Sequence, residues 1–234
     1  MIPRTLPLFA LITSAVFSQE TGPVKAALEQ RLGEVKQSMA QNQARLRQYG
    51  WTEATEISLK GEVKKREQKA CAYGPDGKVQ KIPIGAPPLA PEQSSGRRGK
   101  LKAKVVEKKV DELTDYMERV ASLVHRYVPP NAESMQAAFQ VGKASLNPAA
   151  GSLTFNGYVK PGDQVSLTFD PSTKRVVSCT VATYLDDPKD AVSVVARFSG
   201  LPDGTNFVEE SILVAKAKQI QVKTTNSGYR KTGA

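Results

Sequence analysis

Apolar and polar residues alternate through most of the C-terminal third of the chain, over residues 152–229. A period of two is typical of strands with one buried face. The segments between the alternating stretches are short and rich in Pro, Gly and Asp, so they leave no room for crossover helices. The pattern predicts an antiparallel meander of about six strands: SLTFNGYV, QVSLTFD, RVVSCTVATYL, AVSVVARF, NFVEESILV and KQIQVKTT.

An earlier alternating region covers residues 51–84 and is divided by the sequence Gly-Pro-Asp-Gly at residues 74–77. Pro-Asp-Gly between two extended runs predicts a hairpin. We therefore expect about three further strands in this region.

Three other segments have helical spacing. Residues 23–46 predict a first helix that Gly50 ends, and Asn131 can cap a third, short helix. Between them lies a second helix, stopped by two prolines at residues 129–130. Its apolar seam would also suit a coiled coil, but in a mixed chain such a seam favours a helix packed on a sheet. The seam consists of Val106, Val110, Leu113, Met117, Val120, Val124 and Tyr127.

These elements together predict an α+β fold. We expect a curved antiparallel sheet, a half-open barrel of about nine strands, packed on two or three helices. Helices on the concave face would bury the apolar stripes and one alternating face together.

The first residues have the pattern of an export signal. Arg4 forms a short positive region, residues 6–17 are apolar, and small residues precede a cleavage site before Gln19. An uncleaved membrane anchor is the alternative, but the apolar run is short for that role. We expect a signal peptide at 1–18 and an exported protein, periplasmic or extracellular. Residues 19–234 then form a single domain, with a mobile basic loop at 85–105.

The charge of the chain is strongly basic, formally +10. Residues 60–109 hold fourteen Lys and Arg against five Asp and Glu. Export disfavours nucleic acid as a physiological partner, and the tract lacks the aromatic residues of a stacking platform. An anionic envelope surface is the partner we expect, unless the tract is simply a solvated loop. The candidate anionic-surface residues are Arg97, Arg98, Lys100, Lys102 and Lys104.

Catalytic chemistry finds little support in the sequence. The single histidine, His125, falls near the end of the second helix and off its apolar seam, and no nucleophile or phosphate-loop motif is present. Three aspartates, Asp186, Asp187 and Asp190, could attract calcium but also suit an ordinary turn, which we favour. We expect no enzymatic activity, no metal and no cofactor.

Two cysteines, Cys71 and Cys179, lie on predicted strands. In an oxidising compartment they could form a disulfide, and the alternative is two separate buried thiols. Spacing alone does not decide between them.

Several segments resemble an uncharacterised family of bacterial exported proteins: RQYGWTEATEISLKGEVKKREQKACAYGPDGK, the two helices after it, and LDDPKDAVSV with LPDGTNFVEESILVAKAKQIQVKTTNSGY. More remotely, the order of elements is similar to the periplasmic lipoprotein carrier and acceptor superfamily, the Lol-type fold. That resemblance implies a half-open barrel over helices, with an apolar cavity for acyl chains. It matches no ligand residue here, and it does not predict the basic loop.

Two functions remain open at this point. The first is a binding protein that holds a hydrophobic ligand, such as a lipid or a lipoprotein acyl chain, in the curved sheet. The second is a structural or interaction protein whose basic loop docks an anionic envelope polymer or a protein partner.

Overall fold

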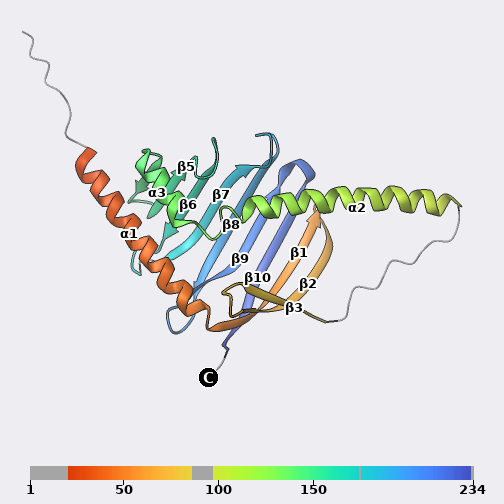
Figure 1. The fold of residues 1–234 in the computed structure, drawn as a ribbon, viewed down its shortest axis with the longest axis horizontal. Helices are drawn as coiled ribbons and strands as arrows, with labels where there is room; N and C mark the ends of the chain where they lie inside the picture. The colour runs from red at the N-terminus through yellow and green to blue at the C-terminus, as the bar shows by residue number, and fades with distance from the viewer. Residues whose placement is uncertain (1–20, 86–96, 174, 233–234) are drawn as a thin grey trace, which may run out of the picture.

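The structure is a computed structural model that describes residues 21–85, 97–173 and 175–232 (Figure 1). The predicted signal peptide at 1–18 and residues 86–96 of the predicted loop lie outside the described residues. The side chains of residues 97–107 lie outside them as well.

The described elements follow the predicted order of helix, strands, two helices and strands. They are α1 (Thr21–Leu46), β1 (Tyr49–Leu59), β2 (Glu62–Tyr73), β3 (Val79–Ile84), α2 (Arg97–Val124), α3 (Ala132–Gln140), β4 (Ala144–Asn147), β5 (Ser152–Asn156), β6 (Gln164–Phe169), β7 (Val176–Tyr184), β8 (Ala191–Gly200), β9 (Asn206–Ala215), a 3-10 turn η1 (Lys216–Lys218) and β10 (Ile220–Lys231).

All ten strands belong to one antiparallel sheet, in the order β3-β2-β1-β10-β9-β8-β7-β6-β5-β4. The predicted α+β fold with an antiparallel sheet is therefore confirmed, but the expected count of about nine strands was too low. The additional strand is β4, which has only four residues and pairs with β5 at one edge of the sheet. Its sequence, Ala-Ser-Leu-Asn, is too short to show a clear alternation.

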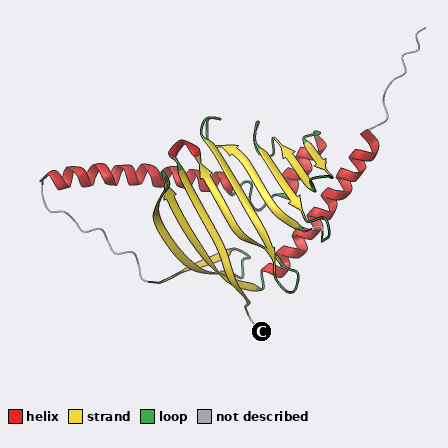
Figure 2. Cartoon of the chain, turned by 180° about the vertical axis from the view of Figure 1, so that it is seen from behind, coloured by secondary structure: helices red, strands yellow, loops and turns green. Residues whose placement is uncertain are grey.

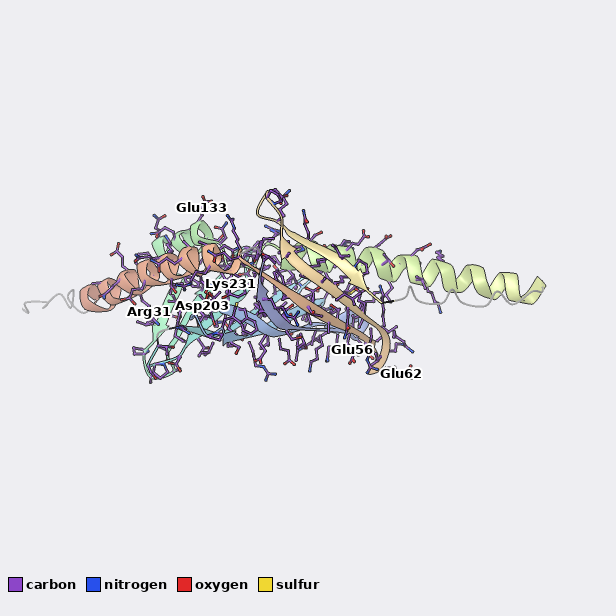
Figure 3. All side chains as sticks on the ribbon, turned by 90° about the horizontal axis from the view of Figure 1, so that it is seen from below. Arg31, Glu56, Glu62, Glu133, Asp203 and Lys231 are labelled. Carbon is purple, nitrogen blue, oxygen red and sulfur yellow. The ribbon has the colours of Figure 1, made fainter. Side chains whose placement is uncertain are left out.

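The three helices lie on one face of the sheet, here called the inner face (Figures 1 and 2). In an edge-on view, β1 and β2 rise toward the side of the helices, so the sheet is curved (Figure 3). The buried core lies between this face and the helices. Its largest fully buried apolar side chains include Tyr127, Met135, Leu153, Phe155 and Leu167.

Helix α2 begins at Arg97, so residues 97–105 are helical and not part of a loop as predicted. Lys, Arg, Ala and Leu are good helix formers, and their high charge had favoured the interpretation as a loop. Among the described side chains of α2, those that pack on the sheet belong to its C-terminal half. Along its seam, Val120 is fully buried whereas Val110 is 55% exposed. Figure 1 shows the N-terminal half continuing past the β1–β2 end of the sheet.

Two local predictions are confirmed at the residue level. The Asn131 side chain accepts hydrogen bonds from the backbone N–H groups of Glu133 and Ser134, as an N-cap of α3 should. The turn at residues 74–77 joins β2 to β3, with the Gly74 N–H donating to the Lys78 carbonyl at 2.8 Å.

A buried carboxylate connects the end of α2 to the segment between β5 and β6. Asp163 is 2% exposed. It accepts hydrogen bonds from the Tyr127 hydroxyl at 2.6 Å and from the backbone N–H groups of Tyr158, Val159 and Lys160. The Tyr127 hydroxyl also lies 2.8 Å from the Thr183 hydroxyl on β7.

Candidate ligand-binding face

The helices are anchored at opposite ends of the sheet. In α1, the Asn42 side chain donates to the Asn206 carbonyl at 2.7 Å, at the start of β9. In α2, the Tyr116 hydroxyl donates to Asp190 at 2.7 Å, at the start of β8. Because β8 and β9 are antiparallel, these two contacts lie at opposite ends of the strands. The middle of β9, β10 and β1 lies between α1 and α2 in Figure 1, and no described helix crosses it.

The strand register shows how the inner face changes where the helices stop covering it. One cross-strand row is apolar on β5 to β8, with Leu153, Leu167, Cys179 and Ala196. On the next strands the same row is polar: Ser211 of β9, Thr224 of β10, Thr55 of β1 and Glu67 of β2. We call Ser211, Thr224 and Thr55 the hydroxyl row. Along this row the inner face is therefore buried core on β5 to β8 and a half-exposed polar surface on β9, β10 and β1.

The neighbouring row stays apolar for longer. It runs through Phe155, Val165, Val181 and Val194 in the core and continues over three more strands. Leu213, Val222 and Ile57, here called the apolar row, are only half-buried. The next position in the row is Lys65 on β2. A half-exposed apolar strip thus leads from the core to a lysine.

Three charged side chains gather where these rows end. Glu67 accepts from Lys69 at 2.9 Å and pairs with Lys65 at 3.0 Å. These contacts lower the pKa of Glu67, with Lys69 as the largest cause. The hydrogen bond to Glu67 also raises the pKa of Lys69. Glu67 and Lys69 are thus both charged near neutral pH.

A second ion pair lies further along the same face. Lys81 of β3 donates to both carboxylate oxygens of Glu53, at 2.8 and 2.7 Å, and Glu53 is 9% exposed. Cys71 is a close neighbour of this pair, and burial is the largest cause of its raised pKa.

An aromatic cluster closes this end of the face. Trp51 stacks on Tyr229 with ring centroids 5.6 Å apart, and Tyr73 and Phe207 pack against these two rings. The Trp51 indole N–H donates to Asn226 at 3.1 Å. The binding face, by which we mean the inner face of β9, β10, β1 and β2, is therefore zoned into an aromatic cluster, a charged zone, the hydroxyl row and the apolar row.

The binding face was not predicted from the sequence. A signal is nevertheless present in β2, where charged residues occupy positions of both parities: Lys64 and Arg66 on one side, and Lys65, Glu67 and Lys69 on the other. A strand without an apolar side does not cover a core. Which charged residues meet the apolar row depends on register, and register is not readable from β2 alone.

The two cysteines do not form a disulfide in this structure. Both are free and buried. Cys71 is on β2 and Cys179 on β7, with β1, β10, β9 and β8 between them. Strands are about 4.8 Å apart, so the two sites are separated by over 20 Å, far beyond the reach of a disulfide. The alternative of two separate thiols agrees with the structure.

The other candidate residues fall away from the binding face. Arg97, Arg98, Lys100, Lys102 and Lys104 belong to the first turns of α2, and their side chains lie outside the described part of the chain. His125 follows α2 and is exposed.

The three aspartates between β7 and β8 form a turn, as favoured from the sequence. Two of them hold α2, because Arg119 pairs with Asp186 and Tyr116 donates to Asp190. Within the described residues, no group of three or more His, Cys, Asp or Glu side chains is placed to hold a metal ion.

The largest of three described surface hollows, about 840 Å³, lies at the β2 edge of the sheet and is lined by residues of both faces. The register places its Ala54, Gln68, Thr225 and Ile84 on the outer face, and its Thr55, Lys65, Glu67 and Lys69 on the binding face. Its charged lining includes the Arg66–Glu56 ion pair, at 2.7 Å, as well as the Lys65, Glu67 and Lys69 side chains.

No known family model matches the chain, and no curated protein matches it. Among solved structures, the chain is similar to the crystal structure of a DUF1329 family protein from Desulfovibrio piger. The two share 14% identity and a TM-score of 0.41, over 89% of this chain and 93% of that chain. At this level the likeness decides neither family nor function, and it lends no support to the Lol-type resemblance. None of the described helices combines the length and apolarity needed to span a bilayer.

Proposed function

We propose that the protein is a non-enzymatic exported binding protein that holds a hydrophobic ligand, such as a lipid or a lipoprotein acyl chain, on the binding face. The supporting observation is the apolar row, which continues the core over β9, β10 and β1 and is only half-buried there. Half-exposed apolar side chains in a continuous strip favour association with an apolar partner. An acyl chain lying on Leu213, Val222 and Ile57 would bury these side chains, as the helices bury the apolar side chains of β5 to β8.

The first experiment is native mass spectrometry of the mature protein purified from its own envelope. We expect a retained mass that denaturation releases and that extracts as lipid. Displacement of a fluorescent acyl probe then locates the site. Val222→Asn and Ile57→Asn should weaken probe binding, because each places a polar group under the chain.

The matched control for these variants is Val195→Asn. Val195 is a 41% exposed valine on the outer face of β8. The Val195→Asn variant should bind the probe as tightly as the unmodified protein does. A protein without saturable probe binding, or row variants that bind as tightly as the control, would contradict the proposal.

The second candidate function is docking to an anionic envelope surface through the N-terminal half of α2. The supporting observation is that this half leaves the sheet while its seam residue Val110 is 55% exposed. A basic helix with an apolar stripe suits an anionic membrane surface. Replacement of Arg97, Arg98, Lys100, Lys102 and Lys104 by Gln should abolish sedimentation with anionic vesicles. Unchanged sedimentation would exclude this role.

A further inference from the structure

The apolar row reaches the rim of the sheet at Lys65. Strand β3 pairs with β2 only from Gln68 to Tyr73, so residues 62–67 of β2 form the sheet edge. The Lys65 side chain is 52% exposed there. From Leu213 to Lys65 the row crosses three strand spacings, about 14 Å. A chain lying on the row would therefore have its inner end at the core and its outer end at Lys65.

At this rim, formed by Lys65, Glu67 and Lys69, the positive charges outnumber the negative ones. Lys65 and Lys69 share one carboxylate, that of Glu67, so one positive charge remains without a counter-charge in this group. The Glu53 carboxylate is already engaged by Lys81 through both of its oxygens. The rim where the apolar row ends is thus complementary to a single negative charge.

The hydroxyl row ends beside this charge, at Thr55. Ser211, Thr224 and Thr55 are half-buried, and their hydroxyls make no side-chain hydrogen bond within the described part of the chain. They occupy the row next to the apolar row and lead to Glu67. Thr55 is one strand spacing from Glu67, so a head group at the rim could accept a hydrogen bond from its hydroxyl as well as from the ammonium groups. Thr224 and Ser211 are two and three spacings from Glu67 and lie beside the alkyl chain instead.

We infer that the ligand of the binding face is an anionic amphiphile, an alkyl chain with one negative charge, whose head group sits at Lys65 and Lys69. The chain lies on Leu213, Val222 and Ile57, the hydroxyl row runs beside it, and Thr55 at the end of that row contacts the head group. A fatty acid carboxylate is the simplest such group, and a phosphodiester carries the same charge. The inference rests on the proposed function and adds the class of head group.

The test measures binding of three amphiphiles by calorimetry: dodecanoate, dodecyl maltoside and dodecyltrimethylammonium. The chains are equal and the head groups are anionic, neutral and cationic. Dodecanoate should bind at least about tenfold more tightly than the cationic amphiphile, because one charge-assisted hydrogen bond accounts for this factor. The preference should weaken as salt is raised, since Lys65 is exposed. A lysophospholipid with a phosphodiester, compared with dodecanoate, distinguishes the two sources of charge.

Two variants should change the affinity for dodecanoate in opposite directions. Lys65→Gln should weaken dodecanoate about tenfold, whereas Glu67→Gln, which leaves both lysines unopposed, should tighten it. Dodecyl maltoside should be unaffected by either. The controls are Arg197→Gln and Glu210→Gln, which change net charge equally but belong to the ion pair of β8 and β9 on the outer face. Circular dichroism checks that each variant is folded.

The outcomes separate the two proposals. If none of the three amphiphiles binds the unmodified protein, the proposed function fails and the inference with it. If all three bind equally tightly, the apolar row holds a chain but the anionic head group is refuted. Control variants that change dodecanoate affinity as much as the rim variants would refute the assignment to Lys65 and Lys69, since net charge alone would then explain the effect.

Discussion

Replacement of Asp163 is expected to destabilise the protein more than a typical single substitution. Its carboxylate is 2% exposed and accepts from four donors, the Tyr127 hydroxyl and three consecutive backbone N–H groups. In Asp163→Ala the Tyr127 hydroxyl can still donate to Thr183, but the three N–H groups lose their acceptor. Each buried unpaired donor costs about 1–3 kcal/mol, and water entering the vacated space favours the low end. We therefore expect a loss of about 4 kcal/mol.

The isosteric change Asp163→Asn should cost less. Its amide oxygen can remain where it accepts from Val159 and Lys160, so only the Tyr158 N–H faces an amide group. The expected loss is about 2 kcal/mol. Both values come from urea unfolding followed by circular dichroism. Thermal unfolding should shift by about 8–16 °C for the alanine variant, given the size of the domain.

The control for this prediction is Asp170→Ala. Asp170 also accepts backbone N–H groups, from Ser172 and Thr173, but in an exposed turn. Water can replace its hydrogen bonds, so its loss should be much smaller. If Asp163→Ala costs no more than Asp170→Ala, burial of the unpaired donors is not what makes Asp163 important.

The remaining predictions concern the helix, the acid range and the thiols. Val120→Ala should cost about 2 kcal/mol in urea unfolding and Val110→Ala almost nothing, because the first side chain is fully buried and the second is 55% exposed; equal losses would mean that the whole of α2 packs. The hydrogen bond from Tyr49 lowers the pKa of Asp203 to about 2. The stability from this contact is complete above about pH 4 and is lost as the pH falls toward about 2. Tyr49→Phe should therefore flatten the pH dependence of the unfolding free energy between these two values. An unchanged slope would exclude the contact as the cause of that dependence. Burial raises the pKa of Cys179 to about 12 and also raises that of Cys71, so neither thiol should react with iodoacetamide at pH 8 until the protein is unfolded; rapid labelling of the native protein would show that one is accessible.

Much of the local structure was predictable because it depends on neighbours in the sequence. The alternation over residues 152–229 and the extended runs on either side of the Pro-Asp-Gly turn in residues 51–84 predicted nine of the ten strands. Asn131 predicted the start of α3 because a cap acts within three residues. The start of α2 was missed, because charge density says little about whether good helix formers will form a helix.

The candidate site could not be predicted in the same way. Lys65 lies only eight residues from its cross-strand partner Ile57 in the chain. Ile57 is also aligned with Val222 and Leu213, which are more than 150 residues away in the chain. A one-residue change of register would move every one of these side chains to the other face. The change from an apolar residue, Ala196 of β8, to the polar residues that follow it in the same row becomes visible only when β8, β9, β10, β1 and β2 are aligned.

The sequence by itself determined which segments become strands and helices, because propensity, periodicity and capping act over a few residues. The tertiary structure alone decided that four strands lie between Cys71 and Cys179, that α1 and α2 are held at opposite ends of the strands, and that no described helix crosses the middle of β9, β10 and β1. These outcomes depend on strand order and register, which arise from contacts between residues distant in the chain.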